Sequence, residues 1–73
     1  MSAVELIAAE HQQRVVDEKK DLDEKRVKLQ AFFNTDLFRV LDQGEKDRLS
    51  TQYSVMALYS EILGQRIAAF STT

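Results

Sequence analysis

The stretch HQQRVVDEKKDLDEKRVKLQAFF, residues 11–33, decides how this chain folds. It contains no Gly or Pro and is rich in Lys, Glu, Gln, Arg and Leu, so the sequence predicts one long helix. Apolar side chains recur every seven residues along it and just before it, which indicates a narrow seam that faces a partner helix. These side chains are Ala8, Val15, Leu22 and Leu29.

The companion positions of this seam, three residues further on, are mostly polar. They hold His11, Glu18, Lys25 and Phe32. In a self-contained coiled coil both sets of positions would be apolar. Two interpretations stay open: a helix edge whose long side chains reach water, or the lining of a polar site between helices.

The residues before this stretch predict a short N-terminal helical arm over residues 2–10. Ser2 fits the N-cap and Glu5 an acidic first turn. The sequence leaves open whether this arm continues into the long helix or breaks from it near residues 10–13.

The residues after the stretch predict a short helix over 35–41 at the end of a hairpin. Asn34 fits a helix stop and Thr35 a new N-cap. Four apolar side chains are expected to plug the end of the hairpin there: Leu37, Phe38, Val40 and Leu41.

The last predicted helix covers residues 43–70, opened by an Asp42-x-x-Glu45 capping box. One stripe, interrupted only by Ser60, suits the hairpin partner: Leu49, Tyr53, Met56, Leu63, Ile67 and Phe70. A second stripe lies to its side: Val55, Leu58, Tyr59, Ile62 and Ala69. One partner helix cannot cover both, so we expect a symmetric homo-oligomer. The tail, residues 71–73, is expected to fray.

The length and composition of the chain limit the classes of protein and the kinds of site that it can form. The 73 residues predict one helical domain, 1–73, near the size at which a single core barely offsets chain entropy. With no Cys and one His, neither disulfides nor a metal site is expected, and no cofactor. A net charge of −2 argues against a general DNA or RNA binder. No membrane span, signal peptide or catalytic constellation is predicted, so we expect a cytoplasmic protein that is not an enzyme.

A basic cluster inside this acidic chain is the candidate for chemistry. It comprises Lys19, Lys20, Lys25, Arg26 and Lys28. Arginine suits directional contacts with phosphate, and an imidazole such as His11 offers a flat face for stacking. His11 and Arg26 are fifteen residues apart, roughly 22 Å along one helix, so they would act together only from different subunits. The structural alternative is an interfacial His and Arg satisfied by neighbouring Glu side chains or carbonyls.

Two segments resemble a family of small phage proteins, the anti-CBASS sponge proteins, which sequester the cyclic oligonucleotide messengers of bacterial CBASS immunity. The long helix carries Q-R-V-V-x-E-K-x-x-L-D-E-K from Gln13, and the last helix carries Y-S-E-I-L-G-Q-R-I from Tyr59. The connecting segment NTDLFRVLDQGEKDRL, residues 34–49, also matches. The similarity spans roughly residues 10–70.

The resemblance implies a helical homo-hexamer in the cytoplasm of the infected host that binds messengers without degrading them. Cyclic dinucleotides would lie between subunits, at His11, where relatives have tyrosine, and at Arg26 with Lys25 beside it. Cyclic trinucleotides would occupy a second pocket, for which Arg66 and Lys28 are the nearest matches. The alternative hypothesis is a helical-hairpin adaptor or phage structural protein with no nucleotide ligand.

Overall fold

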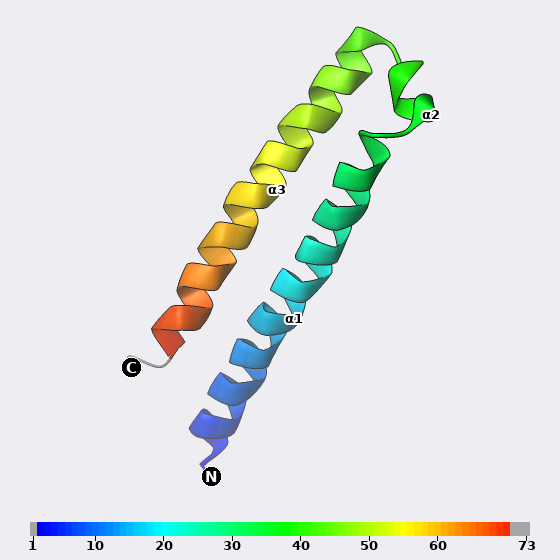
Figure 1. Cartoon of the computed structure of the whole chain (residues 1–73). Coiled ribbons are helices and arrows are strands. Elements are labelled where there is room, and N and C mark those ends of the chain that lie inside the picture. Colours follow the sequence, from blue (N-terminus) through cyan, green and yellow to red (C-terminus); the bar gives the residue numbers. More distant parts are fainter. Residues whose placement is uncertain (1, 71–73) are drawn as a thin grey trace.

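Two long antiparallel helices joined by a short one make up the computed structural model, which describes residues 2–70 (Figure 1). The helices are α1 (Ala3–Phe32), α2 (Asp36–Arg39) and α3 (Gln43–Ala69). No strand occurs among the described residues, so the predicted all-α hairpin is confirmed. The tail that was expected to fray lies outside this range.

The N-terminal arm and the long helix are one element. α1 runs without interruption from Ala3 to Phe32, so the two predicted segments, 2–10 and 11–33, are continuous. Ser2 caps it through a reciprocal pair of hydrogen bonds: the Glu5 amide donates to Ser2 Oγ (3.1 Å) and the Ser2 amide to Glu5 Oε2 (3.0 Å). With no Gly or Pro in residues 3–32, nothing in the sequence interrupts the helix.

The short and last helices begin at the predicted caps. The Thr35 hydroxyl accepts from the Phe38 amide (3.2 Å), and Asp42 Oδ1 accepts from the Glu45 amide (2.8 Å). The second half of the predicted Asp42–Glu45 box is replaced, because the Glu45 carboxylate accepts from Arg48 Nε at 3.0 Å.

An aromatic cluster closes the loop end of the hairpin. Phe38 packs edge-on against Phe32 and Phe33, with ring centroids 5.9 and 5.1 Å away, and Phe33 meets Tyr53 at 5.7 Å. Of the four side chains predicted to plug this end, Phe38 and Leu41 are half-buried. The other two, Leu37 (62% exposed) and Val40 (77% exposed), face outward, because a helix of only four residues buries one side.

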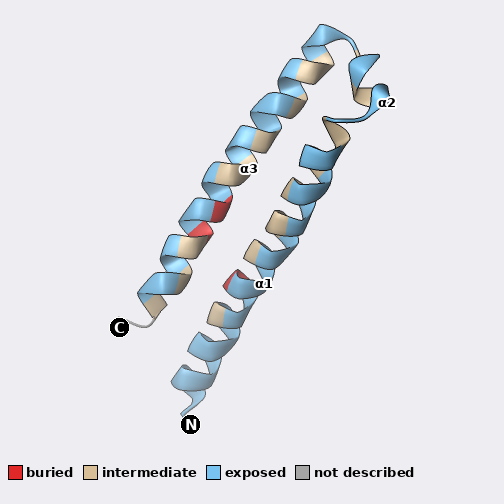
Figure 2. Cartoon of the chain, in the orientation of Figure 1, coloured by how far each residue is buried: buried red, intermediate tan, exposed pale blue. Residues whose placement is uncertain are grey.

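The seam of α3 is as predicted. All seven positions of its first stripe, Ser60 included, are buried or half-buried, and the second stripe is exposed (Figure 2).

The seam of α1 differs from the prediction at its companion positions. The inward companions lie four positions after Ala8, Val15, Leu22 and Leu29, not three. They are Gln12, Lys19, Arg26 and Phe33. Of the predicted companions, His11, Glu18 and Lys25 are exposed, and Phe32 is half-buried. A seven-residue repeat permits either spacing. The hairpin adopts the spacing of four, which places Lys19 and Arg26 on the inner face of α1, where each has a partner on α3.

The protein has little core of its own. Among the described residues only Val15, Ser60 and Leu63 are buried, and the hairpin is elongated, 56 × 16 × 15 Å. Its radius of gyration is 16.9 Å, against about 11 Å for a compact domain of this length. At the N-terminus, residues 3–11 of α1 are all exposed and extend beyond the end of α3 (Figures 1 and 2).

Candidate functional site

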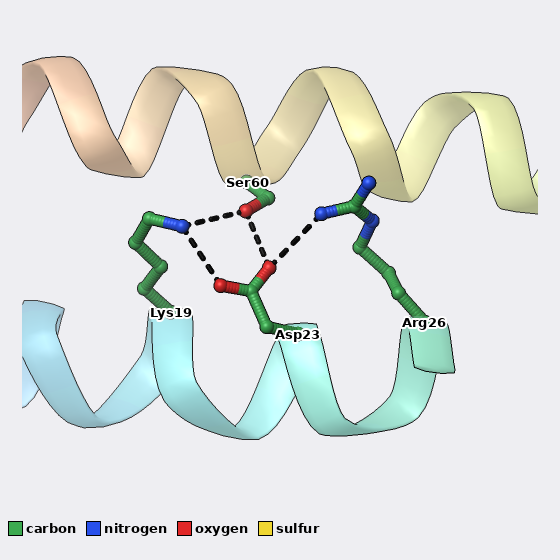
Figure 3. A network of polar contacts seen from close by, with 4 residues as sticks. All are labelled: Lys19, Asp23, Arg26 and Ser60. Atoms are coloured by element: carbon green, nitrogen blue, oxygen red, sulfur yellow. Dashed lines mark hydrogen bonds and ion pairs between the residues drawn. The ribbon is translucent and has the colours of Figure 1, made fainter. Parts of the chain in front are cut away.

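A polar network occupies the middle of the hairpin seam, where a coiled coil would have an apolar layer (Figure 3). Three of its members, Lys19, Asp23 and Arg26, project from α1, and Ser60 projects from α3. Ser60 is 3% exposed, and the three charged side chains are 28–38% exposed. The network therefore links the two helices through half-buried charges.

Asp23 is the centre of this network. Its Oδ2 accepts from Lys19 Nζ (2.8 Å), and its Oδ1 accepts from the Ser60 hydroxyl (2.5 Å) and from Arg26 Nη1 (3.1 Å). Lys19 also donates to Ser60 Oγ at 2.9 Å. The hydrogen bond from Lys19, followed by that from Ser60, lowers the pKa of Asp23 from 3.8 to about 2, and Arg26 contributes in the same direction. Asp23 is therefore a carboxylate at any physiological pH.

Arg26 lies in the seam and is held on two sides. Asp23 accepts from its Nη1, and its guanidinium carbon lies 5.8 Å from the centroid of the Tyr53 ring, a cation–π contact. Its Nε is buried without a hydrogen-bond partner among the described residues. Arg26 thus belongs to the hairpin seam itself.

The network carries one net positive charge, since two cations share a single carboxylate. An anion that approached Arg26 would meet an excess positive charge, a fork of N–H donors and an aromatic face nearby. This arrangement suits the binding of a phosphate group.

His11 lies elsewhere. It is exposed on the part of α1 that extends beyond α3. Because α1 is unbroken between His11 and Arg26, the separation of roughly 22 Å along the axis applies to the folded chain. The hairpin does not bring His11 and Arg26 together.

Lys25 is exposed on the flank of α1 that faces the second stripe of α3. It lines a shallow open groove that also contains Tyr59 and charged side chains of both signs. The members of this groove are Arg14, Asp17, Glu18, Asp21, Leu22, Lys25 and Tyr59.

Lys28 and Arg66, the candidates for a second site, are also apart. Lys28 lines an open groove with Lys20, Asp23, Glu24 and Val27, and Arg66 lies in the last turn of α3. Since Ser60 lies opposite Lys19 and Asp23, Lys28 is displaced toward the loop and Arg66 toward the open end. Their separation is roughly 16–20 Å along the hairpin.

Sequence reasoning missed Asp23, gave Ser60 no role, and identified Lys19 only as a member of the basic cluster. Two signals could have found them. Ser60 is the polar interruption of an apolar stripe, and Lys19, Asp23 and Arg26 have the i,i+4 and i,i+3 spacings of paired charges on one helix face. These four side chains come together only when α1 is rotated about its axis so that Lys19 faces Ser60.

No cluster of three or more His, Cys, Asp or Glu side chains suited to a metal ion occurs within residues 2–70. None of the helices in that range is both long and apolar enough to cross a membrane.

The fold and the network define a small all-helical hairpin protein with a half-buried cationic layer in its seam. A family model, described as Sequestin, matches residues 9–69, and the chain belongs to this family. The name suggests sequestration, which is consistent with a sponge family. Comparisons with curated proteins and with solved structures give no match.

Proposed function

We propose that this protein binds and sequesters cyclic oligonucleotide second messengers without degrading them. Cyclic dinucleotides are the principal ligand, and cyclic trinucleotides occupy a second site. In this proposal it is a phage protein that blocks CBASS signalling in the cytoplasm of the infected bacterium. The sequence resemblance and the family name both support this function.

The observation that carries the proposal is the environment of Arg26. A half-buried guanidinium with excess positive charge beside it suits a phosphodiester, whose charge persists at all physiological pH values. Lys25, one residue away but on the outer flank, provides a second and more mobile cation for the same ligand.

Assembly would complete the site. The chain exposes 5613 Å², about 1,000 Å² more than a globular protein of 8.4 kDa, whereas a standard interface buries about 800 Å² per partner. The exposed second stripe of α3 supplies an apolar surface for such an interface. We propose a hexamer in which His11 of one chain lies near Arg26 of another. The trinucleotide site would join Lys28 and Arg66 in the same way.

Thermal shift against a panel of cyclic di- and trinucleotides tests the proposal. A ligand present at a hundred times its Kd stabilises the folded state by about 2.7 kcal/mol. For a chain of this size the Tm should rise by about 10–20 °C. Ligand recovered unchanged from the denatured complex would support sequestration, and recovered hydrolysis products would indicate an enzyme.

Arg26→Lys is the variant of choice for the dinucleotide site. It keeps the cation but loses the fork of donors, so affinity should fall. Arg26→Ala would also remove a seam contact and a bond to Asp23, so its effect on affinity must be read together with its effect on stability. Unchanged affinity in Arg26→Lys would assign the phosphate contact to Lys25.

Mixed oligomers test whether sites form between chains. Oligomers made from His11→Ala and Arg26→Lys chains should regain some intact sites, because each site takes its two residues from different subunits. If mixing restores nothing, His11 and Arg26 do not share a site.

The apolar stripe of α3 equally suits a different protein partner, which is the basis of the second candidate, an adaptor or phage structural protein. No thermal shift with any cyclic oligonucleotide would favour this candidate.

A further inference from the structure

Asp23 differs from every other acidic residue of α1 in its surroundings. It is half-buried in the hairpin seam, whereas the other acidic residues of this helix, Glu5, Glu10, Asp17, Glu18, Asp21 and Glu24, are all exposed. An acidic residue that only stabilises the surface of a helix does not need to be half-buried in the seam. Three donors converge on this one carboxylate, and one of them is the guanidinium of Arg26 (Figure 3).

The Asp23 carboxylate is held in place by groups other than Arg26. Lys19 holds one oxygen from the same helix, and Ser60 holds the other from α3. Lys19 and Ser60 are also bonded to each other, which closes a three-membered ring of hydrogen bonds. A carboxylate held in this way offers Arg26 one defined position for its Nη1.

The consequence for Arg26 is a restricted side chain. A free arginine has about four flexible torsions and loses most of this freedom when it grips a phosphate. Here the bond to Asp23 and the contact with the Tyr53 ring fix the guanidinium while one face of the side chain stays accessible at 28% exposure. Nη1 is engaged by Asp23, and within residues 2–70 the other terminal nitrogen, Nη2, makes no hydrogen bond that would compete with a ligand, so a directional contact remains available.

We propose that Asp23 is a positioning residue for phosphate binding, acting through Arg26. This rests on the proposed function, since it assigns a role to Asp23 in the same cyclic dinucleotide site. No side chain in the described part of the chain holds Lys25 in this way, so it contributes charge without a fixed direction.

The test is a double-mutant cycle between Asp23→Asn and Arg26→Ala. Its probe is whichever of cyclic di-AMP, cyclic di-GMP and cyclic GMP-AMP gives the largest thermal shift. Asp23→Asn should weaken binding about tenfold, part of the cost of ordering a free arginine. In the Arg26→Ala background the same change should alter affinity by less than about twofold, because the residue through which Asp23 acts is absent.

Ser60→Ala is the matched control. It breaks two hydrogen bonds of the same network and should lower the Tm about as much as Asp23→Asn, but it leaves the Asp23–Arg26 bond in place. Because Ser60→Ala also releases one of the two groups that hold the carboxylate, affinity should fall, but by less than about threefold, against about tenfold in Asp23→Asn. Equal losses of affinity in Ser60→Ala and Asp23→Asn would reduce Asp23 to a structural role and overturn the proposal. Tighter binding in Asp23→Asn would also overturn it, because the carboxylate would then compete with the ligand.

A measurement without ligand separates failure of this inference from failure of the proposed function. In NMR spectra the Arg26 Nη1 protons, which donate to Asp23, should exchange slowly in wild type and Ser60→Ala, and rapidly in Asp23→Asn. If wild type binds none of the cyclic di- and trinucleotides of the panel, the proposed function fails, and the exchange rates still decide whether Asp23 holds Arg26. Equal exchange in wild type and Asp23→Asn would overturn the positioning role.

Discussion

Arg26 and Lys25 are neighbours in the sequence, yet the hairpin places them in different environments. Arg26 points to α3 and is held by a carboxylate and an aromatic ring, whereas Lys25 is exposed on the flank of the helix. Successive residues of a helix are about 100° apart, so the rotation of α1 about its own axis decides which cation is held. The chemistry of the candidate site therefore depends on how α1 is turned against α3.

Acid should remove the contribution of Asp23 to stability. Its pKa is lowered from 3.8 to about 2, so its stabilising effect is present above about pH 4 and is lost as pH falls toward 2. Because the side chain is 38% exposed, solvent screens part of the effect. Asp23→Asn should cost about 1 kcal/mol of unfolding free energy at pH 7.

The measurement is denaturant unfolding of wild type and Asp23→Asn from pH 7 to pH 2. The difference between them should be constant down to about pH 4 and shrink below it. A difference that persists unchanged at pH 2 would mean that the carboxylate does not act through its charge.

Less of the candidate site than of the fold could be predicted from the sequence. Arg26 and Lys25 were identified as candidates from residue type, but their environments were not, since the polar residues of both possible companion sets gave no hydrophobic signal to choose between them. Asp23 reads as one acidic residue among many until Ser60, 37 positions away, is placed beside it.

The N-caps of α1 and α3, Ser2 and Asp42, are similar, but they should contribute differently to the stability of the hairpin. Ser2 caps the part of α1 that extends about 13 Å beyond α3, where no contact with α3 depends on it. Asp42 caps α3 next to the loop, where the first turn contributes half-buried side chains.

We therefore expect Asp42→Ala to lower the free energy of unfolding by about 1 kcal/mol. Ser2→Ala, which removes an equivalent cap, should change it by less than about half as much, because the first turn of α1 can fray while the hairpin stays folded. Circular dichroism at low temperature should show a small loss of helix in Ser2→Ala. Equal destabilisation by both variants would indicate that the N-terminal residues pack against another chain.

The elements themselves were largely predictable. Helix-forming composition, N-cap residues at Thr35 and Asp42, and a seven-residue repeat are local signals, and each helix follows them. The continuity of α1 was not predictable, because residues 10–13 favour a helix without requiring one.

The whole molecule is too extended and too thinly packed to be explained as an isolated hairpin. Two buried apolar side chains among the described residues are a small core for 73 residues. We expect light scattering to give a mass well above 8.4 kDa. Tyr59→Glu and Ile62→Glu should each reduce that mass by placing an unpaired carboxylate in an apolar contact.

Ser50→Glu is the control for these variants. It adds the same charge to an exposed position of α3 that lies off the second stripe, so the mass should not change. If all three variants keep the assembled mass, the second stripe does not form the interface.

The aromatic cluster at the loop end has a consequence for the order in which the chain folds. Phe33 and Phe38 are five residues apart, Phe33 and Tyr53 twenty, and Asp23 and Ser60 thirty-seven. Because short loops close at the lowest entropic cost, α1 and α3 should pack against each other first at the aromatic cluster and then progressively toward the open end. Phe38→Leu should then mainly slow refolding, and Val15→Ala mainly accelerate unfolding, in stopped-flow experiments under dilute conditions. The reverse pattern would place the folding nucleus at Val15.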